Sequence, residues 1–257
     1  MKVSRLWPVV RVLVLPIMLI VIWQAFHSFG VVDRSLVPTP KETFLRAAHF
    51  FTSGNILRDL WETAARMAAG LGLAILVGVP LGMFIGAFKP VYEVTLPAID
   101  FVRSTPVTIL YPVIVLILGV THLAKIAMVF IACIFVIALN TAYGVMRASE
   151  TRKQMARVYG ASRSQLFRWV LFFDSLPQTM VGLRISLSFA LVVEVLCELF
   201  MGSKYGLGQR VSEAYTTYAI ADLYALILIV GTFGFVLNRA FVVIEKKVVP
   251  WSEMEQR

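Results

Sequence analysis

The sequence predicts an all-α, polytopic membrane protein with about six transmembrane helices, and three observations carry that prediction. Of the 257 residues, 59% are hydrophobic and only 15% are charged, whereas about a quarter of the residues in a soluble domain are charged. The apolar residues recur along the whole chain. Several apolar runs reach the roughly 20 residues that a helix needs to cross a bilayer. This pattern favours a protein embedded by many helices over a globular enzyme with one anchor.

Six segments are long and apolar enough to span a membrane. The first, residues 9–29, follows Lys2 and Arg5 and is uncharged from Val12 to Gly30. Since it lacks a small-residue cleavage site, we expect a retained helix and not a signal peptide. Between this span and the next, LVPTPKETFLRAAHFF predicts a proline-marked loop and a short amphipathic helix on the membrane surface. The other five spans are expected at residues 60–88, 105–121, 123–146, 183–202 and 221–244.

The second and third segments carry residues that shape a helix. Three glycines in the second segment are spaced four apart, Gly78, Gly82 and Gly86. They form a flat stripe that lets another helix approach closely, and we favour packing within the chain over contact with a second subunit. In the third segment, Pro106 and Pro112 predict breaks. Broken helices at membrane depth are tolerated where they line a cavity or pack on protein, which favours a transport protein.

The basic residues predict the orientation in the membrane. The net charge is +9. With both termini in the cytoplasm, the inside segments hold 16 of the 24 lysines and arginines, and the opposite orientation would invert that ratio. We therefore expect a multi-pass membrane protein with its N- and C-termini in the cytoplasm. The basic excess is explained by topology, so nucleic acid is not an expected partner.

Residues for catalysis or metal binding are sparse. Cys133 and Cys197 both lie in apolar runs, and the three histidines, His27, His49 and His122, are scattered. No ligand spacing for a metal and no disulfide framework is present. An integral-membrane enzyme would need a convergent cluster of such residues, and none is visible.

One charged segment, residues 147–182, stands apart from the apolar chain. Ser149 suits the start of a helix and Gly160 suits its stop. Ser162, with Gln165 three residues later, forms the pattern of a capping box. Pro177 is expected to end this second helix before the next membrane span begins. The segment therefore predicts a helix, a glycine turn and a second helix, and not a floppy linker.

The same segment resembles the EAA loop of ABC importer permeases. The string is QMARVYGASRSQLFRWVLFFDSLPQTMVGLRISLS. Gln154, Met155 and Phe173 stand where that family usually has Glu, Ala and Pro. Two further strings, TAARMAAGLGLAILVGVPLGMFIG and GSKYGLGQRV, resemble flanking segments of the same permeases, and the nitrate, sulfonate and taurine subgroup is the closest. The matching residues of the loop are Ala156, Arg157, Gly160, Ala161, Ser162, Val170, Leu176, Pro177, Gly182, Leu183 and Arg184.

The resemblance implies a type I ABC importer permease fold, a location in a bacterial-type inner membrane and an assembly. Such permeases work in pairs, so we expect a homodimer bound to two cytoplasmic ATPase subunits. An extracytoplasmic substrate-binding protein would deliver a small solute. This chain has no G-x-x-x-x-G-K-[ST] motif, so no cofactor is expected here, and ATP and Mg belong to the partner. The implied organisation is an N-terminal helix with an external amphipathic segment (1–59), a permease core with its coupling loop at 147–182 (60–250) and a cytoplasmic tail (251–257).

The resemblance also implies which residues meet the ATPase. Gly160 would permit close backbone approach. The basic residues around it suit an acidic-rimmed groove, and Phe167 or Trp169 could supply an apolar anchor. The full expected docking set is Gln154, Ala156, Arg157, Gly160, Ala161, Ser162, Arg163, Phe167 and Pro177.

Glu194 and Glu198 are the ionisable residues that most need an explanation, because a charge at the centre of a span costs about 3 kcal/mol. They lie four apart on one helix face. They either line the translocation path or its outer gate, or they form buried ion pairs between helices. In a path they would disfavour an anion unless paired or protonated, so the solute stays open. Glu62 and Arg66 are expected to pair with each other. Further candidates for the path, explained equally by contacts between helices, are Asn140, Thr108 and Tyr111.

The alternative function is an ATP-independent secondary carrier or channel in which Glu194 and Glu198 bind protons or cations. This hypothesis leaves the ordered basic loop unexplained. An inverted repeat would support it, and the sequence shows none.

Overall fold

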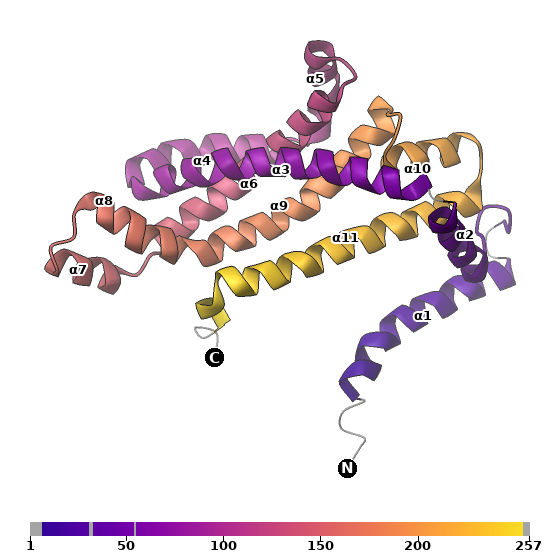
Figure 1. Ribbon diagram of the computed structural model, residues 1–257, viewed down its shortest axis with the longest axis horizontal. Helices are drawn as coiled ribbons and strands as arrows, with labels where there is room; N and C mark the ends of the chain where they lie inside the picture. The colour runs from indigo at the N-terminus through magenta and orange to yellow at the C-terminus, as the bar shows by residue number, and fades with distance from the viewer. Residues whose placement is uncertain (1–6, 31–32, 54, 254–257) are drawn as a thin grey trace.

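The computed structural model describes residues 7–30, 33–53 and 55–253. Within these ranges every regular element is a helix (Figure 1). Elements η2 and η4 are 3-10 helices and η3 is a π-helix. The elements are α1 (Trp7–Phe29), α2 (Pro40–Thr52), α3 (Asn55–Ala87), α4 (Lys89–Ser104), η2 (Val107–Leu110), α5 (Tyr111–Leu118), α6 (His122–Met146), α7 (Glu150–Val158), α8 (Arg163–Gln165), η3 (Leu166–Leu171), α9 (Phe172–Met201), α10 (Leu207–Thr216), α11 (Ile220–Val248) and η4 (Pro250–Glu253).

Four described helices are long and apolar enough to cross a membrane: α3, α6, the continuous helix Arg163–Met201 and α11. The pair α4 and η2–α5 meets the same criterion as a unit, which gives up to five spans. The apolar part of α1, Val14–Phe29, falls among the shorter apolar helices. The described residues therefore show four to five candidate spans where the sequence predicts about six. The basic residues Lys2 and Arg5, and the expected tail beyond residue 253, lie outside the described residues.

The third predicted span, residues 105–121, is only the second half of a bent pair, because α4 and η2–α5 meet at 79°. Thr105 is extended (φ −82°, ψ 123°), because a proline disfavours the helical conformation of the residue before it. The break therefore lies at Pro106. Pro112 makes no break, because it occupies the first turn of α5. The N–H groups of a first turn have no hydrogen-bond partner within the helix, so a proline costs nothing there. Of the two predicted breaks, only the one at Pro106 occurs.

The core of the bundle is formed by α3, α6 and α9, with α6 packed against both neighbours (Figure 1). The glycine stripe of α3 faces α6. A Cβ at Gly82 would overlap the carbonyl oxygen of Ala138, and one at Gly86 would lie 2.6 Å from that of Ala142. Gly78 approaches the backbone of the same helix. The glycines thus let α3 and α6 pack backbone to backbone inside one chain.

The bundle has two distinct ends (Figure 1). The loop end carries α7 and α8, and the α10 end carries α10 and α2. At the α10 end, α2 begins with Thr39 as its N-cap and a proline in its first turn, as the predicted amphipathic helix requires. Trp23 of α1 stacks on Tyr224 of α11, with 5.8 Å between ring centroids, so α1 also reaches this end.

Candidate functional site

The loop end presents the predicted helix–glycine–helix segment. Ser149 caps α7 by accepting a hydrogen bond from the Arg152 N–H (3.3 Å). Gly160 follows α7 with φ +75°, a conformation that glycine adopts without strain. Ser162 and Gln165 form a complete capping box, with bonds of 2.8 and 3.3 Å. Local sequence signals therefore determined this segment.

The predicted helix end at Pro177 is wrong. The helix continues through Pro177, so that Arg163–Met201 forms one helix of 39 residues. Proline removes only one backbone hydrogen bond there, and side-chain contacts with α6 hold the helix together. Thr179, just after the proline, is buried and donates to the Thr141 hydroxyl of α6 (3.2 Å). The second helix of the loop is thus physically part of a membrane span.

The base of the loop is tied to this long helix. Asp174 accepts a hydrogen bond from the Ser149 N–H (3.0 Å) and pairs with the Arg152 guanidinium (2.9 Å). Trp251, after α11, packs on Phe173 with 6.5 Å between ring centroids. These contacts make α7, the turn and the start of α9 one connected body.

The tip of the loop is a mixed apolar and basic surface. Tyr159 and Val158 are 89% and 85% exposed, and Trp169 is 67% exposed. Tyr159 and Val158 were not singled out from the sequence, although apolar residues beside a turn glycine were the available signal. Of the expected docking set, five residues are exposed, Gln154, Arg157, Gly160, Ser162 and Arg163. Four are partly buried, Ala156, Ala161, Phe167 and Pro177.

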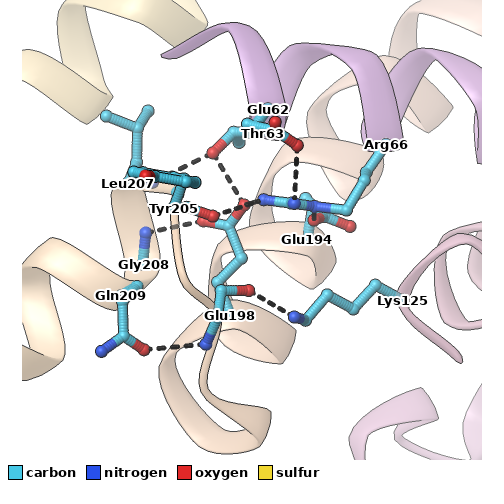
Figure 2. Close-up of polar contacts among 12 residues, drawn as sticks. Glu62, Thr63, Arg66, Lys125, Glu194, Glu198, Tyr205, Leu207, Gly208 and Gln209 are labelled. Carbon is cyan, nitrogen blue, oxygen red and sulfur yellow. Dashed lines mark hydrogen bonds and ion pairs between the residues drawn. The ribbon is translucent and has the colours of Figure 1, made fainter. Parts of the chain in front are cut away.

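The α10 end contains a buried charge cluster (Figure 2). Arg66 of α3 lies between Glu194 and Glu198 of α9, and all three side chains are at least 96% buried. The Arg66 Nε donates to the Glu194 Oε1 at 2.7 Å, and its Nη2 donates to the Glu198 Oε1. The expected ion pair between Arg66 and Glu62 also exists, but its distance of 3.3 Å is longer than those to Glu194 and Glu198. Of the two interpretations left open for the glutamates, this geometry favours ion pairs between helices.

Glu198 also holds the segment between α9 and α10. Its carboxylate accepts hydrogen bonds from the Gly208 N–H and the Thr63 hydroxyl, each at 2.7 Å. The Thr63 hydroxyl in turn accepts from the Leu207 N–H at 3.0 Å. Gly206 has φ +148° and its N–H donates to the buried carboxylate of Asp59 (2.8 Å). Thr63 and Asp59 were missed in the sequence, because nothing local marks a partner far along the chain.

The remaining candidates for the path do not join this cluster. Asn140 bonds to the Val136 carbonyl within α6 (2.8 Å) and accepts from Gln178 of α9 (3.1 Å). Thr108 and Tyr111 border a separate, apolar hollow of about 330 Å³. The structure thus places the polar candidates in three locations.

Beside the buried cluster lies a cavity of about 510 Å³, here called the α10-end cavity. Lys125 of α6 forms part of its wall and donates to the Gly202 carbonyl (2.8 Å) and the Ser203 hydroxyl. Arg58 stacks over the ring of Tyr205 with 3.7 Å to the centroid. The lining residues are Arg58, Glu62, Arg66, Val120, Thr121, His122, Lys125, Gly202, Ser203, Lys204 and Tyr205. Among the residues that the structure describes, no group of three His, Cys, Asp or Glu could hold a metal ion.

Residues 78–250 match the family described as "Binding-protein-dependent transport system inner membrane component". That match spans well over half of the chain. The chain belongs to this family. It is therefore a permease subunit of an ABC importer, a multi-pass inner-membrane protein and not an enzyme. The family implies ATPase and substrate-binding partners.

Known permeases resemble this one along most of the chain. The nitrate import permease NrtB of Synechocystis sp. is 29% identical over 251 residues, 94% of this chain and 90% of that protein. The taurine transport system permease TauC of Escherichia coli is 25% identical over 254 residues, 95% and 92% respectively. The MetNI methionine ABC transporter, in inward-facing conformations, matches at a TM-score of 0.67 with 20% identity, over 77% of this permease and 97% of that chain. The predicted fold and family are confirmed.

Proposed function

We propose that two copies of this permease enclose the translocation path for a small solute of the nitrate, sulfonate and taurine type. Both termini would face the cytoplasm, where two ATPase subunits carry ATP and Mg. A substrate-binding protein would deliver the solute at the α10 end. The nitrate and taurine permeases among its relatives support this cargo class, and the basic loop end supports the orientation.

The observation that carries the mechanism is the continuous helix Arg163–Met201. At about 1.5 Å per residue it is roughly 58 Å long. One end belongs to the loop, and the other holds Glu194 and Glu198 against Arg66 of α3. A displacement of the loop by the ATPases would therefore shift these carboxylates relative to α3. That coupling requires no intermediate flexible element.

The loop tip has the chemistry of a docking surface. Tyr159 and Trp169 offer exposed aromatic groups, and Arg157 and Arg163 offer exposed positive charge. Aromatic residues supply much of the affinity of interfaces, while complementary charges increase specificity and association rate. An ATPase groove with an acidic rim and an apolar floor would match this surface.

The alternative of a free carrier is weaker. A proton or cation site needs carboxylates that are free to exchange ligands, but Glu198 is bound by Arg66, Thr63 and Gly208. The carrier hypothesis would also leave the ordered, basic loop end unexplained.

The docking role is tested by Gly160→Leu. A leucine at φ +75° would strain the turn and place bulk on the proposed contact surface. We expect the variant to insert into the membrane normally but to lose co-purification of the ATPase subunit. Gly30→Leu is the matched control, because Gly30 also has positive φ (+61°) and open space around it. Normal ATPase co-purification with Gly160→Leu, or equal loss in both variants, would sink the docking role.

A further inference from the structure

The α10-end cavity has an unusual charge arrangement. Four cationic side chains line it, and Glu62 is its single acidic lining residue. Glu194 and Glu198 do not line it, since both are fully buried and held by Arg66. A ligand inside the cavity would therefore be surrounded mainly by positively charged groups.

The buried cluster leaves part of this positive charge available. Glu194 and Glu198 carry two negative charges. Arg66 pairs directly with both, whereas Lys125 offsets the second charge only through space, since its ammonium bonds to the Gly202 carbonyl and the Ser203 hydroxyl. At the rim, Arg58 and Lys204 face one acid, Glu62, which already contacts Arg66 (3.3 Å). These four cations and three carboxylates together leave an excess of one positive charge.

Three cations on the wall make no ion pair within the described residues: Arg58, Lys125 and Lys204. Lys125 is 97% buried, yet its ammonium bonds only to a carbonyl and a hydroxyl. An ammonium group has three donors, so one remains for another acceptor. Arg58 and Lys204 both lie against the ring of Tyr205, at 3.7 and 5.5 Å from its centroid. A buried cation without a direct counter-charge is costly, and an anionic ligand would relieve that cost.

We propose that the α10-end cavity binds a small oxyanion, such as an inorganic oxyanion or an alkyl sulfonate, through Lys125, Arg58 and Lys204. The volume of about 510 Å³ lies within the roughly 300–1,000 Å³ typical of small-molecule sites. This inference rests on the proposed function, because it makes the cavity a station on the solute's path within the permease itself. It also explains how a chain with two intramembrane glutamates accepts an anion: both are neutralised by Arg66 and Lys125 before the anion arrives.

The test measures anion binding to the purified permease–ATPase complex in nanodiscs, with no substrate-binding protein present. Nitrate and methanesulfonate are titrated at constant ionic strength, with chloride as the replaced anion, and the thermal stability of the complex is followed. We expect either probe to stabilise the complex beyond chloride. Arg58→Gln and Lys204→Gln should each raise the midpoint, the anion concentration that gives half of the full stabilisation, about tenfold. Each variant loses one charge-assisted hydrogen bond to the anion. Both side chains are exposed, so these variants are expected to fold.

Lys41→Gln is the control, because Lys41 is an exposed lysine of α2 that does not line the cavity. An unchanged midpoint in this variant, with the shift in the other two, supports the site. Equal midpoints in all three variants, or no stabilisation beyond chloride in the unmodified protein, overturn it. If Arg58→Gln and Lys204→Gln leave anion binding unchanged but weaken docking of the substrate-binding protein in a separate binding assay, the cations recognise a partner's carboxylates and the small-anion site is also overturned. Failure of the ATPase to co-purify with the unmodified permease would instead count against the proposed function.

Discussion

The two ends of the bundle use charge in opposite ways. At the loop end, Arg157 and Arg163 are exposed and the polar contacts lie near the surface. At the α10 end, Arg66, Glu194 and Glu198 are buried and bound to each other. Exposed ion pairs contribute about 0–1 kcal/mol, whereas removing one partner of a buried pair costs about 3–5 kcal/mol. Charge at the loop end is therefore available for a partner, whereas the buried cluster at the α10 end joins helices α3 and α9.

The largest expected effect is that of Arg66→Met. It leaves two buried carboxylates without their main counter-charge, so the free energy of unfolding should fall by about 3–5 kcal/mol. Unfolding of the purified permease in detergent by a chemical denaturant measures this change. At the loop end, Arg163→Met should alter stability by less than about 0.5 kcal/mol.

The comparison between the ends fails if both variants lose the same stability. A third variant makes the test sharper: adding Glu194→Gln and Glu198→Gln to Arg66→Met removes the uncompensated charge. Much of the lost stability should then return.

A smaller effect is expected for Glu198→Gln, which keeps the shape of the side chain but removes its charge. The bonds to the Arg66 guanidinium, the Gly208 N–H and the Thr63 hydroxyl should weaken, at a cost of about 1–3 kcal/mol. The cost is smaller than for Arg66→Met because Glu194 still pairs with Arg66. The segment between α9 and α10 would then open more often, and trypsin should cleave faster after the exposed Lys204. Transport should change while ATPase co-purification stays normal. Cleavage and transport at the original rates would show that this carboxylate does not hold the segment.

The smallest effect concerns a pair at the loop end in which Glu150 is exposed and Lys153 is partly buried. The hydrogen bond from Lys153 (2.6 Å) holds the pKa of Glu150 below its ordinary value of 4.5. A lowered carboxyl pKa stabilises the fold above the ordinary pKa, and that stabilisation is lost as the pH falls through the folded-state pKa. Lys153→Gln should return the Glu150 pKa towards 4.5, measured by NMR titration, with no detectable change in unfolding at neutral pH. A clear loss of stability at neutral pH would show that charge at this end also supports the fold.

The parts of the structure that the sequence predicted are those with local causes. Ser162 and Gln165 cap a helix three residues apart, and Gly160 turns the chain between its own neighbours. The stop at Pro177 was predicted wrongly, because a proline ends a helix only when packing does not hold it, and that packing comes from α6. The break at Pro106 was expected, but the helix before it, α4, was not predicted as part of the same bent pair. No local sequence signal distinguishes a segment that connects two spans from one half of a bent pair.

By itself, the sequence determined the membrane-embedded helical class, the order of the main spans and the capped turn at Gly160–Gln165. Each depends on length, hydropathy or hydrogen bonds between residues close in the chain. Only the tertiary structure decided which residues the intramembrane charges pair with. Arg66 and Glu194 are 128 residues apart, so no local pattern could pair them. The packing of α3 and α6 with α9 brings them together and turns the two glutamates into a neutralised cluster beside a basic cavity.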